Sequence, residues 1–305
     1  MSVRCVGVIV NPNAGKGISS QKYRQLIEYL EKYRVSFMHA YLADTSDVNV
    51  ILDNFFRENF DIVMVLGGDG TLNHVGQYLV ERDIPVIVIP FGSGNDFYHT
   101  HWGDRRMDLK SIVLKIVKGE YRTRKVDVAL VEGEGFRRYF FNSFGMGIAG
   151  SVARSVNRAR LKRGFSTFFL SALKDIMLNS RPFYADLKYS DDYFSGGILS
   201  LHAGINPREG GGFLTFPLAD PGDGLLDLVY LSADGVGRLS LLLKLQKVKS
   251  GKHLKDRKIR YLQVPDFSIK LNETVVAHMD GEDFDMDTGE YKIRNLKEKF
   301  TVALI

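Results

Sequence analysis

A glycine-rich segment, Gly67–Thr71 with the sequence GGDGT, contains the residue types that bind phosphate. It follows the apolar run Ile62–Leu66 and precedes Leu72–Val80, whose spacing is helical. Consecutive glycines let backbone N–H groups approach a phosphate without a Cβ in the way, and a helix start adds partial positive charge. Asp69 suits a hydrated Mg²⁺, and Thr71 can cap the helix and donate to a phosphate oxygen. Taken alone, the segment could equally be a tight turn with an acidic cap.

Two further loops have the same character. Pro90–Asp96 follows the buried-looking strand Pro85–Ile89, and Asn11–Gly17 follows the apolar run Val6–Val10. Ligands of open α/β sheets bind beyond the carboxyl ends of the strands. We therefore expect the three loops to converge on one edge of a sheet. Three such loops favour a phosphate site over a simple turn.

The first 125 residues alternate strand and helix signals. Strands are expected at 6–10, 36–41, 62–66 and 85–89, and helices at 23–33, 48–56, 72–80 and 109–117. Strands that are continuously apolar are buried on both faces, as in a parallel sheet covered by helices. This pattern predicts a doubly wound α/β domain over residues 1–125.

Short strands separated by Gly, Asp and Pro turns dominate the rest of the chain. They are expected at 126–131, 138–144, 183–189, 197–202, 225–231, 259–264, 267–271 and 274–279, with helices at 149–179 and 236–250. Such a pattern is typical of an antiparallel β-sandwich. We expect a second, β-rich domain over 126–305, whose last strand could return to the first domain.

The ordered set of motifs resembles a known family. Gly67–Asn73, Gly92–Phe97, Asp220–Asp227 and Asp280–Glu282 stand in the order seen in the catalytic domains of diacylglycerol kinases and sphingosine kinases. The chain is most similar to the soluble bacterial lipid kinases of that group, over nearly its whole length. The resemblance implies an ATP-dependent lipid kinase that phosphorylates a lipid alcohol, such as diacylglycerol, in its second domain.

The resemblance also implies an ATP site. Its residues would be Asn11, Gly67, Gly68, Asp69, Gly70, Thr71, Leu72, Asn73 and Ser93. Two positions depart from the family pattern, because His74 stands where a glutamate is common and His99 where an arginine is common. These replacements put the charge contacts at the two positions in doubt.

Carboxylates supply the metal and proton chemistry that the resemblance implies. Asp69, Asp96 and Asp127 would hold Mg²⁺ through water, and Asp280 or Glu282 would accept the proton of the substrate hydroxyl. Asp220, Asp223 and the carbonyl of Leu225 resemble a second, structural Mg²⁺ site. Each Asp-Gly pair could instead be a simple hairpin turn.

Composition and charge indicate where the protein is located and which partners it prefers. The chain of 305 residues has one cysteine, Cys5, and no apolar run long enough to span a membrane, so we expect a cytoplasmic protein. The net charge is +5, and cations cluster in two runs. One run is Arg154, Arg158, Arg160, Lys162 and Arg163, followed by Phe165, Phe168, Phe169 and Leu170; the other extends from Lys244 to Arg260. These runs favour peripheral contact with an anionic membrane, since no nucleic-acid motif accompanies them.

Two other functions are weighed against the kinase. An NAD kinase shares the Gly-Gly-Asp-Gly-Thr loop, but Gly92–Asp96 and Asp223–Asp227 point away from it. A non-catalytic lipid- or nucleotide-binding regulator would explain His74 and His99 but not the retained carboxylates. An exposed strand edge in the second domain could also pair with another copy to form a homodimer.

Overall fold

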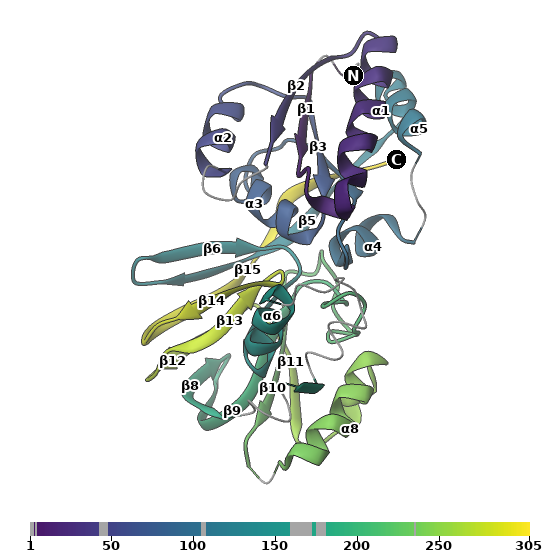
Figure 1. Ribbon diagram of the computed structural model, residues 1–305. Helices are drawn as coiled ribbons and strands as arrows, with labels where there is room; N and C mark the ends of the chain where they lie inside the picture. The colour runs from purple at the N-terminus through teal and green to yellow at the C-terminus, as the bar shows by residue number, and fades with distance from the viewer. Residues whose placement is uncertain are drawn as a thin grey trace. The chain divides into compact units, whose positions relative to one another are not determined.

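The computed structural model describes residues 3, 5–42, 48–104, 108–158, 173–174, 181–234 and 236–305. The chain divides into two compact units (Figure 1). The first comprises Met1–Val126 and Glu298–Ile305, and the second Asp127–Lys297. Strands β5 (Arg122–Gly133) and β15 (Gly289–Leu304) each run from one unit into the other.

The first unit is built on a parallel sheet. Its strands lie in the order β2-β1-β3-β4, and Val302 of β15 pairs in parallel with Val86 of β4. The bounds are β1 Cys5–Val10, β2 Ser36–Tyr41, β3 Ile62–Gly67 and β4 Val86–Pro90. Every residue of β3 is buried, as expected for a strand covered on both faces.

Helices cover this sheet on both sides. On one side α1 packs against α5, and on the other α2 packs against α3 (Figure 1). The elements are η1 Ala14–Gly17, α1 Ile18–Lys32, α2 Val48–Phe55, α3 Asp69–Leu79, α4 Asp96–Trp102 and α5 Leu109–Lys118. Apolar residues of α1 and α5, such as Leu26 and Ile112, join Val8 and Met64 of the strands in one core. The predicted doubly wound α/β domain is confirmed.

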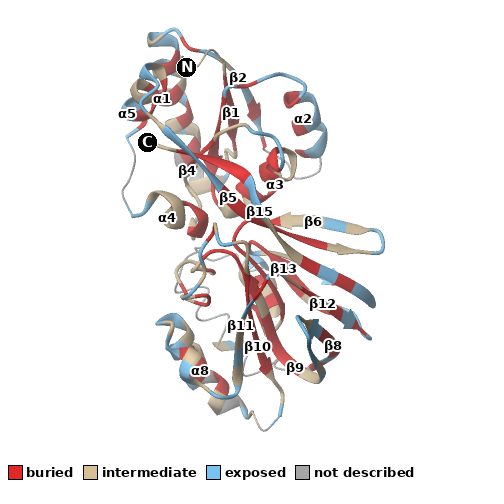
Figure 2. Ribbon diagram, turned by 180° about the vertical axis from the view of Figure 1, so that it is seen from behind, coloured by how far each residue is buried: buried red, intermediate tan, exposed pale blue. Residues whose placement is uncertain are grey.

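The second unit is an antiparallel β-sandwich, also as predicted. Figure 2 shows β10 mostly buried and β9 buried in its later part, and the core includes Phe144, Leu201 and Leu228. The strands besides β5 and β15 are β6 Phe136–Phe140, β7 Ser143–Gly147, β8 Phe183–Tyr189, β9 Asp192–Gly204, β10 Leu226–Ser232, β11 Ile259–Val264, β12 Asp266–Leu271, β13 Val275–Met279 and β14 Glu282–Met286. The strand pairs in this unit are antiparallel.

Two helices and one helical turn accompany these strands. They are α6 Ile148–Arg158, α8 Arg238–Lys249 and η2 Lys252–Lys255. The expected helix over 149–179 is described as far as Arg158, and most of its remainder lies outside the described residues.

The structure differs from the sequence prediction at two places. The single strand expected at 138–144 is two strands, because the backbone N–H groups of Phe141 and Asn142 donate to the Asp280 carboxylate and these two residues lie outside the ladder. Strand β14, which is absent from the strands expected from the sequence, begins at Glu282, and Arg154 pairs with its Asp283 and Asp285.

Candidate functional site

The segment Gly67–Thr71 forms the turn from β3 into α3. A Cβ added to Gly67 would lie 2.4 Å from Thr71 Oγ1, closer than real Cβ atoms come to any neighbour. The first turn of α3 therefore packs directly on the strand end, with Thr71 nearly buried. The N–H groups in such a first turn have no partner within the helix and can bind an anion.

The second glycine loop lies against the first. A Cβ on Gly68 would come within 2.6 Å of Gly92 Cα, and a Cβ on Gly92 would come equally close to Gly68 Cα. The N–H of Phe91 also donates to the carbonyl of Gly67 at 2.8 Å. Glycine is thus required at both positions by the contact between two backbones.

Asn95 fixes the shape of the second loop. It takes the left-handed conformation, with φ 54° and ψ 39°, immediately before α4. Its Oδ1 accepts the N–H of Gly92 at 2.8 Å, and its Nδ2 donates to the Gly92 carbonyl at 2.9 Å. Asparagine suits this position because it tolerates the left-handed region and bonds its own loop.

Asp69 joins the two loops. Its Oδ2 accepts the N–H of Asp96 at 3.2 Å, and its Oδ1 accepts the N–H of Phe97 at 3.1 Å. These donors open α4, so the carboxylate caps that helix from a different part of the chain. The side chain of Asp96 is itself buried at 6% exposure. The Asp69 carboxylate is therefore fixed to the backbone of Asp96, next to the glycine loops.

The third loop reaches the same place through Asn11. Its Nδ2 donates to Thr71 Oγ1 at 3.2 Å, and its N–H donates to the carbonyl of Leu66 at 3.0 Å. The Asn11 Oδ1 also accepts the N–H of Asn13 at 3.0 Å, which turns the loop. The three glycine-containing loops thus meet at one end of the sheet, as the sequence pattern predicts.

The other residues expected at an ATP site differ in exposure. Ser93 is exposed on the second loop, and Gly70 is half-buried at the start of α3. Leu72 and Asn73 are almost fully buried, at 1% and 0% exposure. Both residues belong to the interior of the unit, so they would support the residues that line a nucleotide site and would not line it themselves.

Asp280 stands at the turn between β13 and β14 in the second unit. Its Oδ1 accepts the N–H groups of Asn142 at 2.7 Å and Ser143 at 3.0 Å, and its Oδ2 accepts that of Phe141 at 2.8 Å. Its φ of 48° is left-handed, and it is 8% exposed. These three N–H groups are donors, and the hydrogen bonds that the carboxylate accepts from them fix its position. With Gly281 at φ 87°, the φ of Asp280 gives the backbone of a two-residue Asp-Gly hairpin turn.

Glu282 lies two residues further, at the start of β14. Its Oε2 pairs with Arg138 Nη2 at 2.5 Å, and both side chains are partly exposed. Sequence reasoning missed Arg138, because its partner is 144 positions away and no local spacing signals the pair. Asp280 and Glu282 therefore differ, because backbone N–H groups hold the first and the guanidinium group of Arg138 pairs with the second.

Asp127 lies with the loop 220–225 in the second unit. Its Oδ2 accepts the N–H of Gly224 at 2.8 Å and Nδ2 of Asn295 at 3.2 Å. Asp223 Oδ1 accepts the N–H of Leu225 at 2.8 Å, and the Leu225 carbonyl accepts from Asn295 at 2.8 Å. The structure thus associates Asp127 with two of the residues expected at the second metal site. The sequence analysis had grouped it with Asp69 and Asp96 of the first unit.

Asp220 belongs to the same loop, where its carbonyl accepts the N–H of Asp223 at 3.3 Å. Among the described residues, no group of three or more His, Cys, Asp or Glu side chains could hold a metal ion by themselves. This leaves room for a Mg²⁺ that one or two carboxylates anchor through water.

The basic runs are partly neutralised in space. Arg154 pairs with Asp283 at 2.8 Å and with Asp285 at 2.9 Å. Lys244 is buried and pairs with Asp256 at 2.5 Å, and Lys247 contacts the same carboxylate at 3.2 Å. The carboxyl pKa of Asp256 accordingly falls to about 2, chiefly through its bond with Lys244. Of the first run, 160–170 lies outside the described residues.

No helix in the described ranges combines the length and apolar character needed to cross a membrane. Exposed lysines and arginines remain in the second run, beside the exposed side chain of Leu243.

Comparisons with known proteins agree with this division of the chain. Residues 5–131 match the family model of the diacylglycerol kinase catalytic domain. Residues 142–293 match the model of the YegS C-terminal NAD kinase beta sandwich-like domain. The two matches together cover most of the chain.

Relatives are similar over nearly the whole length. A diacylglycerol kinase of Bacillus subtilis is 26% identical, over 93% of this chain and 91% of its own. One of Mycobacterium tuberculosis is 28% identical, over 82% of this chain and 79% of its own. A solved structure of a putative diacylglycerol kinase from Bacillus anthracis superposes with a TM-score of 0.77 at 22% identity, covering 99% of this chain and 95% of that one, which supports the fold.

Proposed function

The chain belongs to the family of diacylglycerol kinase catalytic domains, and on that premise we propose that it phosphorylates diacylglycerol or a related lipid alcohol. It is an ATP-dependent lipid kinase, a phosphotransferase with an alcohol group as acceptor. The observation that carries the choice of site is the bond from Asp69 to the start of α4, which ties two glycine loops together.

The glycine loops would bind the ATP phosphates. The turn before α3 offers backbone N–H groups and a helix start, while Ser93 is exposed and can donate a hydroxyl hydrogen. Asn11 holds Thr71 in place through its amide. Since phosphoryl transfer depends on positioning and charge neutralisation, such a rigid set of donors is what the reaction needs.

Asp69 and Asp96 would hold Mg²⁺ through water. Asp69 already accepts two backbone N–H bonds, so coordination through bridging water fits this carboxylate better than direct coordination. When bound, the metal would neutralise charge on the transferred phosphoryl group. Asp127, Asp223 and the Leu225 carbonyl would serve a separate, structural cation.

Asp280 is our choice for the residue that accepts the proton of the substrate hydroxyl. Its carboxylate is held by three backbone N–H groups, so it can orient the hydroxyl without moving. Glu282, paired with Arg138, would act as a neighbouring charge.

The surface of α8 and η2 would contact an anionic membrane. Lys252, Lys255 and Arg257 are exposed there, and the Leu243 side chain is 59% exposed. Cations beside an exposed apolar side chain suit the surface of an anionic bilayer, where the acceptor lipid resides.

Transfer from labelled ATP to a panel of lipid alcohols tests the proposed function. Diacylglycerol should be labelled by the wild-type protein in the presence of Mg²⁺, and labelling should fall sharply with Asp69→Asn. NAD is included as an acceptor, because transfer to NAD and to no lipid would replace this proposal by an NAD kinase.

A further inference from the structure

The segment that holds the Asp280 carboxylate is itself held from its opposite side. Phe141 and Asn142 lie between β6 and β7, and their N–H groups donate to Asp280. Their oxygens instead accept from the side chain of Asn206, which lies in the loop after β9. Asn206 is fully buried, at 0% exposure, and Asn142 is almost so, at 3%. The segment therefore lies between two polar side chains, one on each side.

Asn206 donates through one nitrogen to two oxygens of this segment. Its Nδ2 lies 2.8 Å from the Phe141 carbonyl oxygen and 2.9 Å from Asn142 Oδ1. An amide NH₂ group has two hydrogens, so each of the two oxygens can receive one. Turning the amide round would place Asn206 Oδ1, which can only accept, against these two oxygens. The hydrogen bonds therefore fix the orientation of the Asn206 side chain.

A single peptide group connects Asn206 with Asp280. The carbonyl of Phe141 and the N–H of Asn142 belong to the same planar unit, in which they point in opposite directions. The carbonyl accepts from Asn206 at 2.8 Å, and the N–H donates to Asp280 Oδ1 at 2.7 Å. A donor that fixes the direction of the carbonyl therefore also fixes the direction of the N–H. Hydrogen bonds in such a chain polarise one another, which strengthens the bond to the carboxylate.

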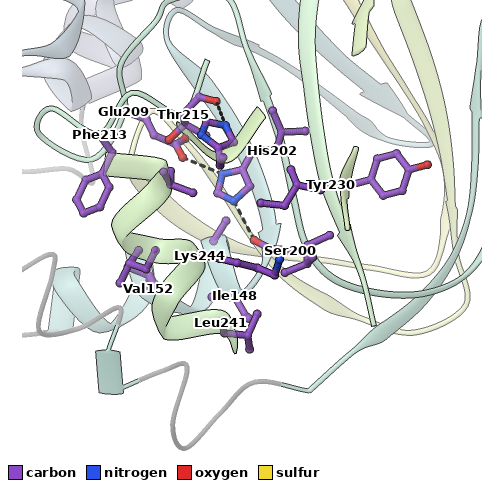
Figure 3. Close-up of a pocket in the computed structure, with 17 residues that line it drawn as sticks. Ile148, Val152, Ser200, His202, Glu209, Phe213, Thr215, Tyr230, Leu241 and Lys244 are labelled. Carbon is purple, nitrogen blue, oxygen red and sulfur yellow. Dashed lines mark hydrogen bonds and ion pairs between the residues drawn. The ribbon is translucent and has the colours of Figure 1, made fainter. Parts of the chain in front are cut away.

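The loop that carries Asn206 is anchored on both sides of this residue. Immediately before it, the N–H of Ile205 donates to the carbonyl of Asn142 at 3.1 Å. Three positions after it, the side chain of Glu209 pairs with His202 of β9 at 2.8 Å (Figure 3). Glu209 and His202 both line the apolar cavity drawn in that view. Asn206 thus has a fixed position from which its amide can orient the segment.

We propose that Asn206 is a positioning residue for phosphoryl transfer, because it aligns the peptide group that fixes Asp280. This role rests on the proposed function, with Asp280 as the residue that accepts the proton of the lipid hydroxyl. A base acts only within hydrogen-bond reach of the proton that it removes, and a misplacement of about 1 Å can cost about 100-fold in rate. Asn206 belongs to a different unit from the glycine loops. Its loss should therefore slow transfer and leave ATP binding intact.

Asn206→Leu tests this role, because leucine has a similar shape and no hydrogen-bond donor. We expect kcat for lipid phosphorylation to fall about 10- to 100-fold, while KM for ATP stays as in wild type. Amide hydrogen exchange of residues 141–143, followed by mass spectrometry, should become faster in the same variant. Ile269→Val is the control, since it removes a buried methyl group from the core of this unit and so lowers stability alone. It should change neither kcat nor exchange at 141–143.

The two measurements separate the possible failures. Faster exchange at 141–143 with unchanged kcat would overturn the proposal, because Asn206 would then order the segment without affecting transfer. A fall in kcat without faster exchange, or an equal fall in Ile269→Val, would overturn it too, since the effect would not pass through the segment. A wild-type protein that phosphorylates no lipid alcohol would instead remove the proposed function, and the positioning role with it. If Asn206→Leu does not fold, Asn206→Ser replaces it: its hydroxyl can donate to only one of the two oxygens, so kcat should fall about tenfold.

Discussion

Asp69 and Asp96 are fixed against each other, since Oδ2 of Asp69 accepts the backbone N–H of Asp96 at 3.2 Å. The same carboxylate accepts the N–H of Phe97 at 3.1 Å. Asp69 therefore has a structural task, the capping of α4, alongside the metal-organising task we propose for it. The two tasks predict different consequences of losing the negative charge.

Asp69→Asn should impair both tasks. The amide nitrogen cannot accept, so one of the two backbone N–H groups loses its partner, and we expect the free energy of unfolding to fall by about 1–2 kcal/mol. Loss of the charge should lower kcat roughly 100-fold, because a preorganised charge at the transferred phosphate is removed. Urea unfolding and labelled-ATP rates measure the two effects. Glu28→Gln, the same change on the exposed face of α1, is the control, and unchanged kcat in Asp69→Asn would contradict the metal role.

Gly68→Ala should separate the two glycine loops. The new Cβ would meet Gly92 Cα at 2.6 Å, and neither backbone can turn aside as a side chain would. We expect KM for ATP to rise about tenfold or more, because the N–H groups around the phosphates lose their alignment. Gly237→Ala is a matched control, since a Cβ there meets no atom within 4 Å and φ is −84°. Equal KM values for the two variants would show that the loop contact does not shape the nucleotide site.

Asp280→Asn and Glu282→Gln should separate the two candidates for the base. In Asp280→Asn the amide NH₂ group faces the backbone N–H groups of residues 141–143, which need an acceptor. We therefore expect this variant to lose activity and to have a lower melting temperature. An amide at 282 can still accept from Arg138, so kcat should fall less than about tenfold. ATP binding, followed by fluorescence, should survive in both variants because the glycine loops belong to the other unit. If Glu282→Gln alone abolished turnover, the base would be Glu282.

The sequence predicts those parts of the site that depend on local signals. Ile62–Leu66 is continuously apolar and is followed by glycines, so both the buried strand and the turn into α3 are foreseeable. The meeting of three loops follows from parallel strands that share one edge. The contact between Gly68 and Gly92 cannot be predicted from the sequence, since a glycine does not reveal which other backbone segment it contacts.

Contacts between distant positions escape such reasoning. The break at 141–142 between β6 and β7 arises from Asp280, which lies almost 140 positions away, while the sequence of the segment predicts one strand. Arg154 sits in a run of cations with no acid nearby in sequence, yet strand β14 supplies two carboxylates to it. A run of cations in the sequence therefore overestimates the positive charge on the surface, because ion pairs with residues far away in the sequence cannot be recognised from the run itself.

Charge reversal on η2 tests the membrane contact. Lys252→Glu with Lys255→Glu should lower binding to anionic vesicles about tenfold or more, because each exposed lysine contributes about 1 kcal/mol near such a surface. Lys188→Glu with Lys270→Glu makes the same change of charge on exposed strand positions and should bind like wild type. Co-sedimentation with vesicles of phosphatidylserine and phosphatidylcholine measures both. A wild-type protein with no preference for the anionic vesicles would rule the contact out.

The buried pair of Asp227 and Tyr261 predicts a dependence of stability on pH. Burial raises the pKa of Asp227 to about 6, against about 3.9 in an unfolded chain, although Tyr261 and Gln263 donate to it. At a pH between these two pKa values the folded state keeps a proton on Asp227 that the unfolded state has lost. The stability that this proton contributes is therefore fully present below pH 4 and disappears as pH rises through 6. Asp227→Asn cannot ionise, so relative to wild type its free energy of unfolding should gain about 1–3 kcal/mol between pH 4 and pH 7.5. Asp186 gives the matched control, because Ser195 and Tyr193 lower its pKa. Relative to wild type, the free energy of unfolding of Asp186→Asn should fall between pH 4 and pH 7.5. Urea unfolding at the two pH values measures both variants, and a difference for Asp227→Asn that does not change with pH would show that Asp227 titrates normally.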